Sequence, residues 1–386
     1  MESIVRFIKD LDWANNIFFL LLGALLTKLC SWIFAQVNYI KRKQKMKKTT
    51  NFFLTEGINS LDHAEKFYAE DDISAELLGE ERFYLSIPQN YLADLRKHSA
   101  SYQSREECYF AKNTLAQLGE EMGIDGFDAL VERHRTKVAA AFLDSYQTGK
   151  GIFNGEKVGI RRIISTRSSI GEKNEANELH FQMYKTDYFT HRVMRSVYQE
   201  IRENNKDLAA AATGSITDIN RYYPFMTSLG INSVVVLHTN DQIEQIVLAE
   251  RAAFTSNTNT PQWHVTVNEG VTVEDITDRN AGISAAVLRG FREEMGITRQ
   301  EIRNRQSDLF LVVDSFEVGL SGIAYIKMNY DTFKLCYLGA KDACLETEQI
   351  KSIEYSKRAI TKFLQGDAPK TEACKYCLSM LLSRMI

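Results

Sequence analysis

Residues 283–297 constrain the fold of this chain more than any other stretch. Small and apolar residues recur there every three or four positions, which predicts a helix with one buried face. Gly296 follows the last turn, where glycine commonly caps a helix. The same helix carries Arg289 and two adjacent carboxylates, Glu293 and Glu294. Because clustered carboxylates beside an arginine can hold Mg²⁺ against a diphosphate, we expect this helix to lie at the functional site.

Residues 289–297 resemble the second half of the Nudix box, R-E-U-x-E-E-x-G-U, in which U is a bulky apolar residue. The arginine, the later glutamates, the glycine and the apolar positions match, whereas the first glutamate is Gly290. In that family all three glutamates contribute to the metal face. The resemblance therefore implies Glu293 and Glu294 as the ligands of a weakened Mg²⁺ site. The alternative is that both only form surface pairs with neighbouring arginines.

The residues before this helix read as strands. The β-branched run at 231–238 predicts a buried strand, and a second strand ends near Arg251. A polar loop, Trp263 and Gly270 follow. This order resembles the opening of a Nudix fold, with a longer loop before the box arginine. The resemblance implies a C-terminal Nudix-like α/β/α sandwich at 228–386, with Arg251 and Trp263 as ligand-binding residues.

The segment at 17–37 is mostly apolar and long enough to cross a bilayer as a helix. A basic run at 41–48 follows it, which places the larger C-terminal part in the cytoplasm. We therefore predict an N-terminal transmembrane helix within residues 1–48 and a single-pass membrane protein. The alternative is an apolar helix in a soluble core.

Small side chains recur every four residues along one face of this segment, and such stripes let helices approach closely in lipid. They are Gly23, Thr27, Ser31 and Ala35. Lys28 lies near the middle of the segment, where an unpaired charge is costly. It either extends to the membrane surface or faces the interior of a helix assembly. The stripe predicts self-association.

Residues 49–227 show both helical and strand patterns, so the chain as a whole is expected to be α+β. Within this region Tyr188, His191 and Arg192 combine aromatic and basic side chains. Aromatic faces stack on bases and arginines bind phosphates, which makes the three a candidate nucleotide-binding edge. The alternative is the start of a helix with a solvated basic face.

Composition excludes some classes of function. The net charge of −3 provides no general attraction to nucleic acid, so no duplex partner is expected. The six cysteines are scattered and do not form a disulfide framework, which indicates a reducing compartment.

The combination of a membrane segment and an altered box is similar to the membrane-anchored Nudix effectors of bacterial antiphage defence. That resemblance implies a cyclic oligonucleotide or other nucleotide ligand, assembly with itself, and disruption of the lipid of the bacterial inner membrane. Two other functions remain open. One is a membrane-tethered, Mg²⁺-dependent Nudix hydrolase of a nucleoside diphosphate derivative, and the other is a structural membrane protein without a nucleotide ligand.

Overall fold

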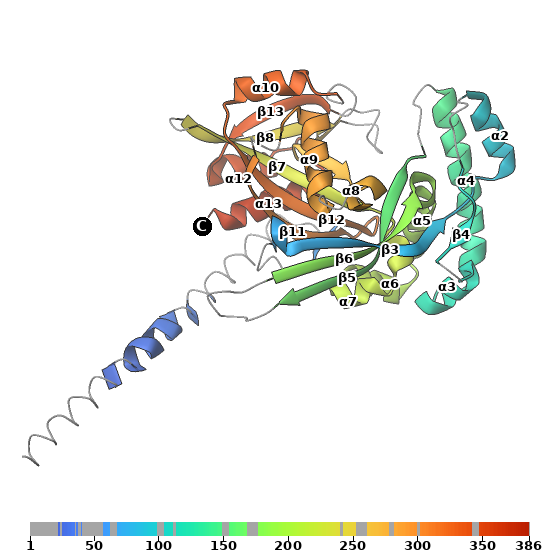
Figure 1. Cartoon of the computed structure of the whole chain (residues 1–386), viewed down its shortest axis with the longest axis horizontal. Helices are drawn as coiled ribbons and strands as arrows, with labels where there is room; N and C mark the ends of the chain where they lie inside the picture. The colour runs from blue at the N-terminus through green and yellow to red at the C-terminus, as the bar shows by residue number, and fades with distance from the viewer. Residues whose placement is uncertain are drawn as a thin grey trace, which may run out of the picture. The chain divides into compact units, whose positions relative to one another are not determined.

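The chain divides into two compact units, Met1–Phe52 and Phe53–Ile386 (Figure 1). Residues on both sides of the predicted boundary at 228 therefore belong to the second unit. The computed structural model describes residues 22–23, 25–34, 36–37, 40, 57–61, 68–98, 104–110, 113–148, 154–167, 177–239, 242–251, 261–277, 282–298, 302–341 and 347–385.

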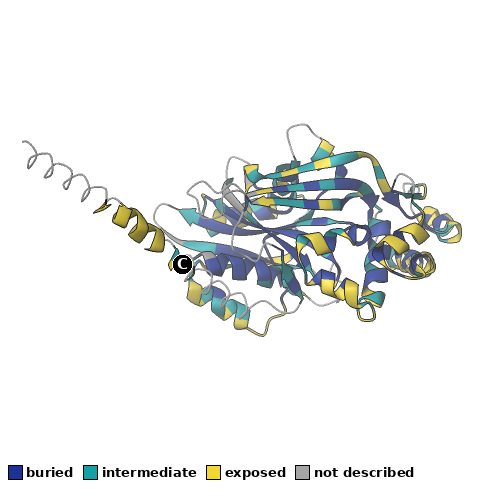
Figure 2. Ribbon diagram, turned by 90° about the horizontal axis from the view of Figure 1, so that it is seen from below, coloured by how far each residue is buried: buried dark blue, intermediate teal, exposed yellow. Residues whose placement is uncertain are grey.

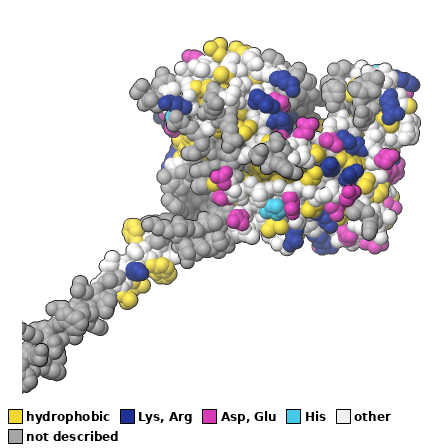
Figure 3. Space-filling model, in the orientation of Figure 1, with side chains coloured by type: hydrophobic (Ala, Val, Ile, Leu, Met, Phe, Trp, Pro, Cys, Tyr) yellow, Lys and Arg dark blue, Asp and Glu magenta, His cyan; other side chains and the backbone are white. Residues whose placement is uncertain are grey.

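The described part of the first unit is helical and exposes its large apolar side chains. Lys28 is the one charged residue among the described residues of this unit. Figure 3 shows one basic side chain among the hydrophobic ones of this helix. Within the small-residue stripe, the Thr27 hydroxyl donates to the Gly23 carbonyl at 2.8 Å, whereas Ala35 lies outside the described residues. Among the described residues, no helix combines the length and hydropathy needed to span a bilayer. The transmembrane helix stays a prediction from the sequence.

Nine described strands form the larger sheet of the second unit, in the order β1-β11-β12-β7-β8-β13, with β2 on β11, β10 on β7 and β9 on β8. Only β7 and β12 pair in parallel among these described pairs. The bounds are β1 Ile58–Ser60, β2 Tyr68–Ala69, β7 Leu229–Thr239, β8 Gln242–Arg251, β9 Gln262–His264, β10 Val267–Gly270, β11 Ile302–Val312, β12 Glu317–Ile326 and β13 Thr347–Glu354. Strands from near residue 60 thus complete a sheet built mainly from residues beyond 228.

Helices cover both faces of this sheet. Val235 and Leu237, two positions apart on β7, pack with Phe291 of α9 (Gly282–Met295) and with residues of α10 (Tyr330–Leu338). Helix α13 (Glu372–Arg384) packs against β7 and β12, and α12 (Lys357–Gln365) packs against α13. Side chains alternate between the two faces of a strand, so the β-branched run in β7 is buried on both. The prediction of a buried strand there is confirmed.

A four-stranded sheet lies beside the larger one, in the order β4-β3-β6-β5 (Figure 1). Its strands are β3 Ile73–Tyr84, β4 Cys108–Tyr109, β5 Glu156–Arg167 and β6 Asn177–Asp187. The helices of this region are α2 Gln89–His98, α3 Leu115–Met122, α4 Phe127–Gln147, α5 Tyr188–Ile201, α6 Lys206–Ala212 and α7 Ile216–Asn220. One continuous core of buried side chains includes Phe181, Val193 and Leu309, and so joins both sheets (Figure 2). The expected mixed α+β class is confirmed.

The outer edge of strand β5 is covered by one side chain and by one backbone bond. The Ile163 N–H donates to Asn220 Oδ1, and Asn220 Nδ2 donates to the Ile163 carbonyl, both at 2.9 Å. The Ile160 N–H donates to the Met226 carbonyl at 2.7 Å. Open strand edges invite pairing with another chain, so these bonds protect β5 while fixing the segment that leads into β7.

Candidate functional site

Helix α9 is formed and ended as the sequence predicts. Its buried face includes Ile283, Ala286, Phe291 and Met295. Gly296 adopts the left-handed conformation, with φ of 66°, and its N–H donates to the Arg292 carbonyl at 3.1 Å. This is the cap expected from a glycine after the last turn.

The glycine that replaces the first box glutamate is a point of close packing. A Cβ at Gly290 would lie 2.8 Å from Val267 Cγ1 and 3.0 Å from Glu269 Cβ. Helix α9 therefore rests directly on β10 at this position. Gly290 removes one carboxylate from the box. Val267 and Glu269 pack so closely against this position that they leave no room for a side chain.

Arg289 is held by residues that precede the helix. Its guanidinium lies 3.0 Å from the Glu269 carboxylate and 2.9 Å from that of Asp275, and it donates to the Gly270 carbonyl at 2.8 Å. Asp275, in α8 (Val273–Thr277), also accepts from the Thr272 N–H at 2.8 Å. Burial opposes ionisation of Asp275, yet the hydrogen bonds from Arg289 and Thr272 hold its pKa below the usual value. Arg289 thus joins β10, α8 and α9 as a charged, part-buried cluster.

The two remaining box glutamates point to different partners. Glu293 is surrounded by cations, with Arg292 at 3.5 Å and both Arg289 and Lys341 at 3.9 Å. Glu294 is 6% exposed and accepts from the Asn268 N–H at 3.3 Å through both carboxylate oxygens.

This arrangement does not fit the Mg²⁺ ion that the box resemblance implies. Mg²⁺ takes near-octahedral oxygen ligands, and the carboxylates of Glu269, Asp275 and Glu293 are already compensated by Arg289 and its neighbours. Among the described residues, no three His, Cys, Asp or Glu side chains are grouped so that they share one ion.

A narrow cleft opens between the ends of several strands and the box helix. Its lining residues come from β8, β9, β10, α9 and β13, and the connections between them. They are Ala249, Arg251, His264, Val265, Thr266, Asn268, Glu294 and Thr347. The cleft holds about 20 Å³ of space for the centres of water molecules, enough for about one water-sized group. The structure thereby brings Arg251 and Glu294, two residues predicted from the sequence, to one place.

Trp263 does not line this cleft. Its ring packs edge-on against Phe363 at 6.0 Å, and its backbone N–H donates to the Pro369 carbonyl at 2.9 Å. The next residue, His264, lines the cleft instead, because neighbouring side chains of a strand point to opposite faces. Sequence reasoning missed His264, although strand alternation was the signal that could have found it.

Tyr188, His191 and Arg192 lie on the first turns of α5, and none of them lines the cleft. The His191 imidazole is 5% exposed and bonded to Thr227 Oγ1 at 2.9 Å and to Glu317 at 3.2 Å, so both ring nitrogens have partners inside the protein. Burial lowers the pKa of His191, and Glu317 partly offsets the shift.

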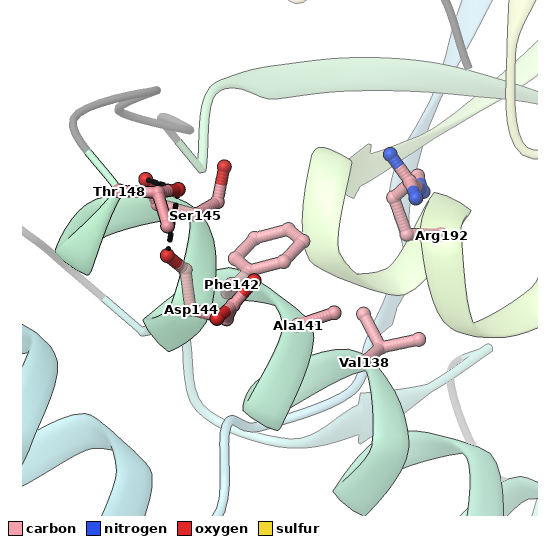
Figure 4. A pocket seen from close by; sticks show the side chains of 7 residues that line it. All are labelled: Val138, Ala141, Phe142, Asp144, Ser145, Thr148 and Arg192. Atoms are coloured by element: carbon pink, nitrogen blue, oxygen red, sulfur yellow. Dashed lines mark hydrogen bonds between the residues drawn. The ribbon is translucent and has the colours of Figure 1, made fainter. Parts of the chain in front are cut away.

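Arg192 borders a larger hollow, of about 280 Å³, whose other walls come from the last turns of α4 (Figure 4). These walls are Val138, Ala141, Phe142, Asp144, Ser145 and Thr148. The Arg192 guanidinium donates to the Tyr188 hydroxyl at 3.0 Å, and the Tyr188 ring stacks on Phe142 at 6.0 Å. The carbonyl end of α4 and the Asp144 carboxylate disfavour a phosphate there. The hollow is therefore a weaker candidate for an anionic ligand than the Arg251 cleft.

A half-buried carboxylate pairs with two side chains of α5. Glu317, at the start of β12, pairs with His191 and with Arg195 at 3.1 Å. Burial opposes ionisation of Glu317, but His191 and Arg195 lower its pKa to about 2. Lys157 of β5 interacts electrostatically with Glu317, Glu269 and Arg289, and burial lowers its pKa.

No family model and no curated protein matches this sequence. Solved structures that match include the Nudix domain of Shewanella oneidensis NrtR complexed with ADP-ribose, at 14% identity and a TM-score of 0.28, over 41% of this chain and 88% of that one. A mutT/nudix family protein from Listeria innocua matches at 15% identity and a TM-score of 0.25, over 41% and 93% of the two chains. Because these TM-scores lie below 0.5, functional inference here rests on the residues of this chain.

Proposed function

We propose that residues 228–386 form a Nudix-like module that binds a nucleotide-derived ligand without cutting it efficiently. One observation carries the proposal: Glu293 of the box pairs with Arg289, Arg292 and Lys341, and Glu294 accepts from the Asn268 N–H, while Arg251 lines a cleft beside the box helix. Mg²⁺-assisted attack on a diphosphate needs carboxylates that are available to the metal. Binding a phosphate needs only a positioned cation and hydrogen-bond donors.

The membrane part of the proposal rests on the sequence. The apolar segment at 17–37, its small-residue stripe and the basic run at 41–48 support a bilayer anchor that associates with itself. A ligand that brings second units together would raise the local concentration of the anchors, so that weak helix contacts add up. We propose that this couples a nucleotide signal, of the cyclic oligonucleotide type, to disruption of the bacterial inner membrane in antiphage defence.

Calorimetric titration of the full-length chain in detergent tests the binding. The ligands are ADP-ribose, ADP and cyclic di- and trinucleotides, without added metal. We expect at least one to bind, and Arg251→Ala to weaken that binding tenfold or more because a charge-assisted hydrogen bond is lost. The matched control is Arg292→Ala, which removes an arginine whose side chain is 69% exposed on α9. Absence of binding by every ligand contradicts the proposal.

Membrane attachment has its own test. After expression in bacteria, the full-length chain should remain in the membrane pellet through an alkaline carbonate wash, and cross-linking in the membrane should increase when the ligand is present. Release of the chain into the wash would refute the anchor, and ligand-independent cross-linking would refute ligand-driven assembly.

A second candidate is a hydrolase of nucleoside diphosphate derivatives, favoured by the position of Arg251 and Glu294 in one cleft. It predicts Mg²⁺- or Mn²⁺-dependent release of phosphate-containing products, abolished by Glu294→Gln. Brisk turnover with that dependence would establish the hydrolase and overturn the non-cutting module.

A further inference from the structure

The outward face of the four-stranded sheet carries a hydrogen-bonded serine, histidine and glutamate. Ser74 and Glu76 are two positions apart on β3, so their side chains point to the same face, and both residues are exposed. His180 pairs with Ser74 in the ladder between β3 and β6, which places its imidazole beside them. Figure 3 shows histidine and acidic side chains next to one another on the surface over this sheet. The His180 side chain is 32% exposed and that of Glu76 is 50% exposed, so a molecule in the solvent can reach this group.

Both ring nitrogens of His180 have the partners that activation of a serine needs. Ser74 Oγ lies 2.9 Å from Nδ1, and a Glu76 carboxylate oxygen lies 3.2 Å from Nε2. An ionised carboxylate only accepts, so Nε2 carries the proton in the neutral ring and Nδ1 accepts from the Ser74 hydroxyl. That tautomer lets the imidazole take the serine proton. A nucleophile, a base and a group that orients the base form a Ser-His-acid triad, which is recognised by geometry rather than by sequence position.

Neighbouring side chains hold Glu76 in its place and add charge to the same face. Gln182, two positions after His180 on β6, donates to the same Glu76 oxygen at 3.0 Å. The hydrogen bonds from Gln182 and His180 hold the pKa of Glu76 below its usual value, so the carboxylate is charged at neutral pH. Arg162 of β5 pairs with Gln182 in the next ladder, and its exposed side chain adds positive charge to this face. Positive charge stabilises the oxyanion that forms when a hydroxyl attacks an acyl group.

We propose that Ser74, His180 and Glu76 form a second functional site, which transfers the acyl group of an activated ester or thioester to water. This activity is separate from the proposed nucleotide binding. Ser74 is the nucleophile, His180 is the general base, and Glu76 is the positioning residue that fixes the ring tautomer. Because the three residues are exposed, substrate binding contributes little to the rate, and the substrate class is limited to acyl groups with a good leaving group.

The reaction has two halves. Ser74 Oγ bonds to the acyl carbon while its proton passes to His180 Nδ1, and the tetrahedral adduct then expels the leaving group, which takes that proton. Water next attacks the acyl-serine ester and gives its proton to His180 Nδ1. The ring returns this proton to Ser74 Oγ as the acid departs. One ester or thioester and one water thus become one acid and one alcohol or thiol.

The test is hydrolysis of p-nitrophenyl acetate by the full-length chain in detergent, followed by mass spectrometry of the acid-quenched protein. We expect a burst of p-nitrophenolate and an acetyl group on Ser74. Ser74→Ala should abolish both, and His180→Gln should slow acylation about 100-fold, a typical contribution of general-base catalysis. The matched control is Ser86→Ala, because the Ser86 hydroxyl is bonded to Glu107 and Arg135 rather than to an imidazole. It should leave the rate unchanged.

The role of Glu76 is tested by separating kcat from KM. Glu76→Gln should lower kcat at least tenfold and leave KM unchanged, because the new amide can donate to Nε2 and so reverse the tautomer of His180. The Ser74, His180 and Glu76 variants change partly or fully exposed side chains, so their melting temperatures should equal that of wild type.

Three results would each overturn the proposal. The first is hydrolysis no faster than that of heat-denatured protein. The second is hydrolysis that persists in Ser74→Ala, which would mean that an imidazole or another side chain attacks the ester directly. The third is an acetyl group found only on residues other than Ser74. None of these results bears on nucleotide binding, which is measured separately by titration.

Discussion

Restoring the box glutamate at position 290 should damage this protein rather than activate it. In an unobstructed helix, replacing glycine by alanine stabilises by about 1 kcal/mol. Here the new Cβ would lie 2.8 Å from Val267 Cγ1, and Val267 is fully buried in β10. Overpacking of a core typically costs about 1–3 kcal/mol. We therefore expect Gly290→Ala to lose about 1 kcal/mol of unfolding free energy.

Gly290→Glu should lose more, about 3 kcal/mol, because the longer side chain cannot be accommodated against Val267 and its charge would approach Glu269. It should also fail to produce metal-dependent hydrolysis. Urea denaturation followed by circular dichroism measures the first effect, and phosphate release with Mg²⁺ measures the second.

Arg292→Ala is the control in the same helix, and as an exposed change it should stay within about 0.5 kcal/mol of wild type. If the Gly290→Glu variant were as stable as wild type, β10 would have to shift at little cost in free energy to accommodate the new side chain. If that variant also hydrolysed nucleoside diphosphates, the close packing of α9 would not be what excludes the metal.

Three further predictions concern stability. The pKa of His264 is lowered from 6.5 to about 3, so the unfolded chain takes up a proton first as the pH falls. The resulting loss of unfolding free energy, up to about 1.4 kcal/mol per pH unit between pH 6.5 and 3, should be measurable by urea denaturation in wild type and should be smaller in His264→Phe by the His264 contribution. Asn220→Ala should lower the unfolding free energy by about 1–3 kcal/mol, since it leaves the Ile163 backbone unpaired; a smaller change would mean that water replaces the amide. Arg289→Met should lower it by about 3 kcal/mol by leaving Asp275 uncompensated, and a loss below about 1 kcal/mol would argue against a stabilising role for the cluster.

The sequence alone determined the local elements. The periodicity of α9 and its stop at Gly296 depend on residues within a few positions of each other, as does the β-branched run of β7. The box resemblance pointed to Glu294, and the order of strands before it pointed to Arg251; the fold brings both to the same cleft. Such features are predictable because helix periodicity, caps and strand burial are encoded locally.

The tertiary structure decided how the box residues are used. Arg289 was expected beside Glu293 one turn away, yet its close partners are Glu269 and Asp275, which the fold of the preceding loop brings to it. No local pattern shows that Gly290 touches β10, because that contact depends on how the helix sits on the sheet.

Register also decided which neighbouring side chain reaches the cleft. A one-residue change in the pairing of a short strand reverses which face each side chain occupies, and β9 places His264 rather than Trp263 beside Arg251. Likewise, Tyr188 and Arg192 lie one turn apart on α5, but only the packing of α4 on α5 determines the hollow that Arg192 borders. Local sequence specifies the elements, whereas contacts between residues far apart in the chain determine what the site can bind.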